Sequence, residues 1–195
     1  MEIVGVEKIK NGQVKIYFDS GQEIQMSEKN FKRLDLQKKI TLDQYNFIIE
    51  NVLYNEACGK ALKFLSASSK SIAQIKEKLA AYPELVIENV IKFLKEYHYA
   101  DDELFAKNYI YDALTLKFYG RTKIIFELRQ KKIDDEIIFD ALEKYLDDEK
   151  EIESATQIAK IKFKSSSPND LLKLKNMLYR RGFSFNIIER AIKNL

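Results

Sequence analysis

The first 26 residues alternate between apolar and polar side chains, which is the pattern of half-buried β-strands. Every second residue is apolar in the segment 14–18, and the segment 24–26 continues the alternation. Asn11 and Gly12 lie between two strand-like segments, and both residue types tolerate a positive φ angle, so they predict a two-residue hairpin. This part of the chain is therefore expected to form a small antiparallel meander that packs on a helix following Ser27.

Beyond Lys39 the apolar residues recur at spacings of three and four, which is typical of helices with one buried face. Thr41 with Gln44, and Ser71 with Gln74, have the spacing of capping boxes, in which each side chain covers an exposed backbone N–H group. Pro and Gly are scarce, with two and six copies in the chain. From this point onwards the sequence predicts helices almost throughout.

The helical part contains a repeat of about 50 residues, in which apolar positions coincide without a gap. The pairs are Leu128 with Leu178, Ile133 with Phe183, Ile137 with Ile187, Ile138 with Ile188, Ala141 with Ala191 and Leu142 with Ile192. A three-helix unit leaves apolar edges that the next unit can cover, so stacked units form an elongated array. One compact bundle with accidental periodicity is the alternative.

The predicted fold is therefore mainly α, with tandem three-helix repeats in an elongated array and a small N-terminal antiparallel β-meander. The expected divisions are a β-rich extension at 1–40 and three-helix repeats at 41–98, 99–147 and 148–195.

Capping residues mark helix ends within the second and third repeats. Asp101 and Asp134 precede helical segments and are suited to the N-cap position, as is Ser167 before Pro168. Gly182 fits the left-handed position just past a helix end.

Composition narrows the class of protein. No apolar run approaches the roughly 20 residues that span a bilayer, and residues 1–8 lack the layout of a secretory signal. A single cysteine excludes an internal disulfide framework. No Walker loop or nucleophile elbow is present. We expect a cytoplasmic, monomeric protein that is not an enzyme and needs no cofactor.

The net charge is only +3, but the charges are arranged in blocks. Residues 117–132 contain six basic and one acidic residue, a net of +5, and residues 134–153 contain two basic and ten acidic residues, a net of −8. Residues 160–195 contain nine basic and two acidic residues, a net of +7. Solvated helix faces explain any single block, whereas recurrence of the basic block in two repeats favours an anionic partner.

Two segments carry a family resemblance. Residues 99–106 read Tyr-Ala-Asp-Asp-Glu-Leu-Phe-Ala, and residues 120–131 follow the pattern Gly-x-x-x-Ile-x-x-Glu-Leu-x-x-Lys. At these residues the chain resembles the RecX family, the regulatory proteins of the bacterial recombinase RecA. The resemblance covers roughly residues 57–195, and Lys132 stands where the family commonly has glycine.

The resemblance implies tandem three-helix repeats and a non-enzymatic negative regulator. Such a protein binds the RecA–DNA filament along its groove and inhibits ATP hydrolysis, strand exchange and coprotease activity, with weak binding to single- or double-stranded DNA. A sequence-independent DNA-binding helical module is the alternative, and an interaction scaffold for another protein is a third possibility.

The candidate contacts with RecA or DNA lie mainly on the basic helices of the second and third repeats. They are Arg121, Lys123, Arg129, Lys131, Lys132, Lys173, Lys175, Arg180, Arg181 and Tyr119. Solubilising surface charges are the competing interpretation of these cations.

A dense set of aromatic residues could stack on bases, although their helical spacing favours packing in the cores. The set comprises Tyr97, Tyr99, Phe105, Tyr109, Tyr111, Phe118, Tyr119 and Phe126. Tyr119, beside Gly120 and Arg121, is the candidate for an exposed aromatic.

The remaining candidate chemistry favours structural roles. His98 is the only histidine, so it lacks partners for a metal site and is expected in a turn or in packing. Cys58 is expected as a small core residue. The acidic segment 147–149 with Glu151 could bind a divalent cation, but a solvated junction between repeats is the preferred interpretation.

Overall fold

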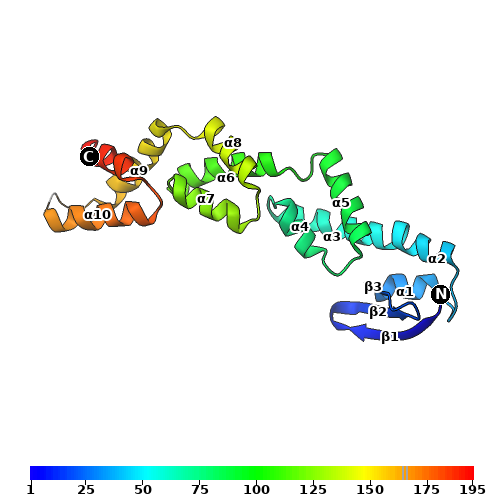
Figure 1. Ribbon diagram of the computed structural model, residues 1–195. Coiled ribbons are helices and arrows are strands. Elements are labelled where there is room, and N and C mark those ends of the chain that lie inside the picture. The colour runs from blue at the N-terminus through cyan, green and yellow to red at the C-terminus, as the bar shows by residue number, and fades with distance from the viewer. Residues whose placement is uncertain (164, 166) are drawn as a thin grey trace. The chain divides into compact units, whose positions relative to one another are not determined.

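The computed structural model describes residues 1–163, 165 and 167–195. The chain folds into two compact units, Met1–Ala100 and Asp101–Leu195. The first unit begins with a three-stranded antiparallel sheet of order β1-β2-β3 (Figure 1). The strands are β1 (Ile3–Ile9), β2 (Gln13–Phe18) and β3 (Glu23–Ser27).

The hairpin between β1 and β2 confirms the positive φ angles but not the loop length. Asn11 has a φ of 62° and Gly12 a φ of 68°, both left-handed. The expected two-residue loop is wrong, because Ile9 pairs with Gln13 and leaves Lys10 in the loop as well. The extra residue belongs to a short 3₁₀ turn that the dipeptide signal does not reveal.

One face of the sheet is buried against helices. Val14, Ile16 and Met26 are buried, as the alternation predicts. Helix α1 (Glu28–Leu34) begins at Ser27, whose hydroxyl accepts a hydrogen bond from the Asn30 N–H. Sheet and helices share one hydrophobic core, which supplies the stability that a three-stranded meander lacks alone.

The rest of the first unit is helical. Both predicted capping boxes are confirmed, at Thr41 with Gln44 and at Ser71 with Gln74. The segments are α2 (Leu42–Phe47), the π-helical η2 (Ile48–Leu53), α3 (Tyr54–Ala67), α4 (Ile72–Lys78) and α5 (Glu84–Glu96).

The second unit contains two groups of three helices, each around its own core. The first group is α6 (Asp102–Thr115), α7 (Arg121–Gln130) and α8 (Asp135–Tyr145). The second group is α9 (Asp148–Lys162), α10 (Pro168–Arg180) and α11 (Phe185–Lys193). The mainly helical fold with a small N-terminal sheet is thus confirmed, while the four-part division and the elongated arrangement stay predictions.

The predicted caps are confirmed with one exception. Asp101 accepts a hydrogen bond from the Leu104 N–H, and Ser167 accepts one from the Asp170 N–H. Asp134 precedes α8 as expected, but its side chain makes no capping hydrogen bond.

The 50-residue repeat is visible in the backbone of the second unit. Lys132 (φ 58°) and Gly182 (φ 88°) occupy equivalent left-handed positions after α7 and α10. The next residue in each repeat donates its N–H to an equivalent carbonyl, Ile133 to Leu128 and Phe183 to Leu178. The offset read from the apolar positions is therefore the structural offset. Lys132 adopts at this position the conformation that glycine adopts most readily.

Candidate partner-binding surface

The first turn of α7 is held by the repeat that follows it. The backbone N–H groups of this turn have no side-chain cap, because Gly120 occupies the N-cap position. Gly120 donates to the Arg181 carbonyl (2.8 Å), and Thr122 donates to the Gly182 carbonyl (3.2 Å). The turn between α10 and α11 thus completes the start of α7.

Two glycines allow this close approach. A Cβ atom on Gly120 would lie 2.5 Å from the Gly182 carbonyl carbon, and one on Gly182 would lie 2.3 Å from the Lys123 backbone nitrogen. Neither position has room for a side chain without a backbone shift. We call this contact between the two repeats the α7 joint, made by residues 120–123 with 181–183 and Glu151.

Glu151 on α9 supplies the third acceptor of the α7 joint. Its buried carboxylate accepts the Arg121 backbone N–H at 2.8 Å, and the other carboxylate oxygen lies 3.7 Å from the Arg121 Nε. Burial raises the pKa of the Glu151 carboxyl, against the opposing effect of Arg121. The expected solvated junction is therefore wrong for Glu151.

Two candidate arginines also belong to this joint. Arg121 donates through Nη2 to the Leu146 carbonyl at 3.2 Å. Arg181 donates through Nη1 to the Lys117 carbonyl at 2.5 Å and to the Phe118 carbonyl at 3.4 Å. Sequence reasoning missed these contacts. The available signal was a glycine at a helix N-cap, which leaves the capping to another segment.

The other candidates on α7 lie mostly in pairs with nearby carboxylates. Lys123 pairs with Glu127 at 2.9 Å. Arg129 makes a bidentate contact with Asp135, at 2.7 and 2.9 Å. Such exposed pairs contribute about 0–1 kcal/mol, so the cations can exchange a carboxylate for another anion at little cost.

Lys131 and Lys132 follow directly after α7. The Lys131 ammonium lies 5.6 Å from the ring centroid of Tyr109. Lys132 follows in the exposed turn after the helix.

The candidates on α10 include one stripe at helical spacing. Lys173, Arg180 and Arg181 line a shallow depression together with Asn176 and Met177. Lys173 lies 3.7 Å from Asp170, and Arg180 is exposed. Lys175 lies outside this depression and pairs with Glu189 on α11 at 2.6 Å. The structure thus brings part of the predicted set together on α10 and directs Lys175 elsewhere.

The aromatic residues divide between core and surface. Phe105 and Tyr109 are buried as expected, whereas Tyr97, Tyr99 and Phe126 are exposed, so the core interpretation is wrong for them. Tyr111 is also exposed, at 67%.

Tyr119, expected to be the exposed aromatic, is instead partly buried against the core of the first group of helices in the second unit. Tyr179 on α10 is 71% exposed and was not singled out in the sequence. The Tyr119 backbone N–H donates to the Ala113 carbonyl of α6 at 2.8 Å, and the next residue, Gly120, belongs to the α7 joint.

The remaining sequence candidates have structural positions. His98 lies in the turn after α5 with a φ of 55°. Cys58 is partly buried, and burial raises the pKa of its thiol. Asp147 caps α9 through the Lys150 N–H. Across residues 1–163, 165 and 167–195, no cluster of three or more His, Cys, Asp or Glu side chains could hold a metal ion.

The fold and this surface define a helical-repeat protein with cationic patches on exposed helices. None of the described helices has the length and apolar character required to cross a bilayer.

Comparisons with known proteins identify the family. Residues 101–142 match the family model described as RecX, second three-helix domain. The regulatory protein RecX of Clostridium tetani (strain Massachusetts / E88) is 32% identical over 202 residues, covering 98% of this chain and 92% of that protein. The regulatory protein RecX of Caldanaerobacter subterraneus subsp. tengcongensis is 29% identical over 191 residues, covering 96% and 95%. The chain belongs to the RecX family of regulatory proteins.

Two solved RecX structures are similar to this chain. A crystal structure of regulatory protein RecX superposes with a TM-score of 0.65 at 25% identity, covering 98% of both chains. The crystal structure of RecX from Lactobacillus salivarius gives a TM-score of 0.66 at 27% identity, covering 73% of this chain and 96% of that one.

Proposed function

We propose that this protein is a non-enzymatic negative regulator of RecA. It binds the RecA–DNA filament along its groove and inhibits ATP hydrolysis, strand exchange and coprotease activity. It acts as a cytoplasmic monomer and binds free single- or double-stranded DNA only weakly.

The observation that carries the proposal is the recurrence of exposed cations on equivalent helices of two successive repeats. Arg129 lies in the last turn of α7 and Lys132 in the turn that follows it, and Lys173 and Arg180 lie on α10. A filament presents the same anionic groups at regular intervals, so modest contacts made by successive repeats combine into tight binding. Membership in a family of regulatory proteins supports the same conclusion.

The α7 joint changes the list of contact residues. Arg121 and Arg181 hold the repeats together, so reversing their charge would disturb the fold as well as the surface. Lys123, Arg129, Lys131, Lys132, Lys173, Lys175 and Arg180 remain the proposed cationic contacts, with Tyr119 beside them at the start of the joint.

The proposal is tested by measuring DNA-dependent ATP hydrolysis by RecA from the same organism. Added at substoichiometric ratios, this protein is expected to reduce the rate, because one molecule bound in the groove affects several RecA subunits. An unchanged rate at all ratios would remove the proposal.

The alternative function is a sequence-independent DNA-binding module. The salt dependence of binding to bare DNA distinguishes it from a regulator that binds the filament. A phosphate binder loses affinity for bare DNA steeply between about 50 and 200 mM salt. A filament binder associates much more tightly when RecA and nucleotide are present.

A further inference from the structure

Two exposed aromatic side chains on the last two helices have no role in the surface described so far. Tyr179 on α10 is 71% exposed, and Phe185 at the start of α11 is 72% exposed. Across residues 1–163, 165 and 167–195, neither ring stacks on another aromatic ring or lies beneath a cation. Large apolar side chains that are left exposed together mark interaction sites.

The packing of α10 against α11 brings the two aromatic residues to one face. Lys175 of α10 pairs with Glu189 of α11 at 2.6 Å, so these faces of the two helices adjoin. Tyr179 follows Lys175 by four residues, and Phe185 precedes Glu189 by four residues. Residues four apart lie on the same face of a helix, one turn from each other. The two aromatic residues therefore occupy neighbouring positions, one turn closer to the connection between the helices.

The preceding repeat supports this geometry and shows what differs. The 50-residue offset matches Tyr179 with Arg129 and Phe185 with Asp135. Arg129 and Asp135 contact each other at 2.7 Å, so side chains at these two positions are within reach of one another. The last repeat thus has two aromatic rings without partners where the preceding repeat has a closed ion pair.

The helices that carry the rings are basic. Residues 168–193 contain six basic and two acidic residues, a net charge of +4. Both acidic residues pair with lysines of α10. Arg180, next to Tyr179, is exposed, and among the residues that the structure describes it has no carboxylate within 4 Å. A polyanion is therefore attracted to the surface around the rings.

Exposed rings beside cations suit a single-stranded nucleic acid. An unpaired base can stack on an aromatic side chain while its phosphates are attracted by neighbouring cations. In a duplex the faces of the bases are covered by the adjacent base pairs, so a protein reaches a base face only after extruding the base. An apolar protein surface could also cover the rings, but it would make no use of the net charge of +4.

We propose that Tyr179 and Phe185 form a stacking platform for the unpaired bases of single-stranded nucleic acid, with Arg180 as a phosphate contact beside it. Stacking on a ring does not depend on which base is present, so the platform is expected to bind without sequence preference. The inference deepens the proposed function and rests on it for the identity of the nucleic acid, which is the DNA on which RecA is assembled.

The first test uses tryptophan fluorescence, since the chain contains no tryptophan. Tyr179→Trp places a single indole on the platform. We expect a single-stranded oligonucleotide to quench its emission, because the indole stacks on a base, and the duplex of the same sequence to leave the emission unchanged.

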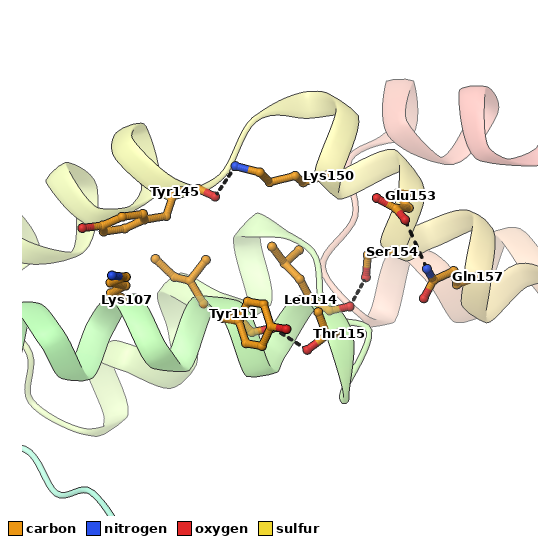
Figure 2. Close-up of a pocket in the computed structure, with 10 residues that line it drawn as sticks. Lys107, Tyr111, Leu114, Thr115, Tyr145, Lys150, Glu153, Ser154 and Gln157 are labelled. Atoms are coloured by element: carbon orange, nitrogen blue, oxygen red, sulfur yellow. Dashed lines mark hydrogen bonds between the residues drawn. The ribbon is translucent and has the colours of Figure 1, made fainter.

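The matched control is Tyr111→Trp on α6, where the native tyrosine is 67% exposed. Figure 2 shows Tyr111 on one side of a groove, with Lys150 and Glu153 on the other side. Residues 134–153 carry a net charge of −8, which repels a row of phosphates. The emission of Tyr111→Trp is therefore expected to stay unchanged with either oligonucleotide.

The second test removes the rings. We expect Tyr179→Ala/Phe185→Ala to weaken binding of the single-stranded oligonucleotide by at least about fivefold, measured by fluorescence anisotropy at low salt, and to leave the affinity for the duplex unchanged. Tyr179→Phe retains the ring and should retain the affinity. The control Tyr111→Ala/Phe139→Ala removes the same two residue types from exposed positions on α6 and α8 and should bind as the unchanged protein does.

The outcomes separate this inference from the proposed function. Unchanged single-strand affinity in Tyr179→Ala/Phe185→Ala, or an equal loss for single strand and duplex, would overturn the platform. Normal single-strand binding together with lost inhibition of RecA would mean that a protein surface covers the rings, and this too would overturn it. If the unchanged protein fails to inhibit RecA, the proposed function is removed, and the oligonucleotide measurements still decide whether the rings stack on bases.

Discussion

At the scale of single residues, Glu151 shows how one buried carboxylate joins two repeats. The residue is only 2% exposed, and its carboxylate accepts the Arg121 backbone N–H. Removing this acceptor leaves a backbone donor without a partner inside the protein, which costs about 1–3 kcal/mol. The carboxylate itself pays a desolvation penalty, which is why its pKa is raised.

Two substitutions of Glu151 separate the hydrogen bond from the charge. We expect Glu151→Ala to lower the free energy of unfolding by about 1–3 kcal/mol. Glu151→Gln keeps an oxygen acceptor, so it is expected to retain most of this stability. The measurement is urea denaturation followed by far-ultraviolet circular dichroism, since the chain contains no tryptophan. Equal stability of the alanine variant and the unchanged protein would contradict this role.

The glutamine variant also carries a pH prediction. A carboxyl whose pKa is raised in the folded state loses its proton first in the unfolded state. The contribution of Glu151 to the stability of the folded protein therefore decreases as the pH rises. The decrease begins near the usual pKa of glutamate and ends above the raised pKa of the folded state. Relative to Glu151→Gln, the unchanged protein should be more stable at acidic pH than at neutral pH. A stability difference that is independent of pH would contradict this assignment.

At the scale of elements, the turns after α7 and α10 are equivalent in backbone but different in surroundings. Both turns contain a left-handed residue, Lys132 in one and Gly182 in the other. The Gly182 turn packs closely against the start of α7, where the Gly182 carbonyl accepts the Thr122 N–H. A side chain is therefore tolerated at position 132 and excluded at position 182.

The matched pair Gly182→Ala and Lys132→Ala tests this difference. Gly182→Ala combines a left-handed alanine with a Cβ placed 2.3 Å from the Lys123 nitrogen. We expect it to lower the free energy of unfolding by at least about 2 kcal/mol, whereas Lys132→Ala should change it by less than about 1 kcal/mol. Thermal unfolding followed by circular dichroism compares the stabilities of the two variants. Similar losses of stability would contradict the close packing of Gly182 in the α7 joint.

At the scale of the whole molecule, the alternation of charge decides which partners can approach which segment. Residues 117–132 and 160–195 carry net charges of +5 and +7, and residues 134–153 between them carry −8. A polyanion is attracted by the basic segments and repelled by the acidic one. In the proposed function the basic helices therefore meet anionic groups of the filament.

A double charge reversal on the basic helices tests this assignment. We expect Lys132→Glu/Arg180→Glu to weaken filament binding and to make it less sensitive to salt between about 50 and 200 mM, because fewer counterions are released. The Lys92→Glu/Lys95→Glu variant controls for net charge and should retain both affinity and salt dependence. Co-sedimentation across this salt range provides the measurement. Unchanged inhibition of RecA by a folded Lys132→Glu/Arg180→Glu variant would remove these residues from the contact surface.

The sequence alone determined the secondary structure and the repeat, because both depend on local spacing. The apolar alternation predicted the strands, and the capping boxes at Thr41 and Ser71 predicted two helix starts. The 50-residue offset assigned Lys132 and Gly182 to equivalent positions of two repeats. The family could be recognised for the same reason, since its pattern is a run of neighbouring residues.

Only the tertiary structure decided what the charged residues do. Arg121 and Arg181 have the sequence character of surface cations, yet they bind backbone carbonyls of the segments that connect neighbouring helices. Glu151 lies in an acidic run, yet it is buried beneath α7. Lys107, Lys144 and Tyr145 are brought together from two helices. The energy of a charge depends on burial and on partners distant in the chain, and neither can be read from its sequence neighbours.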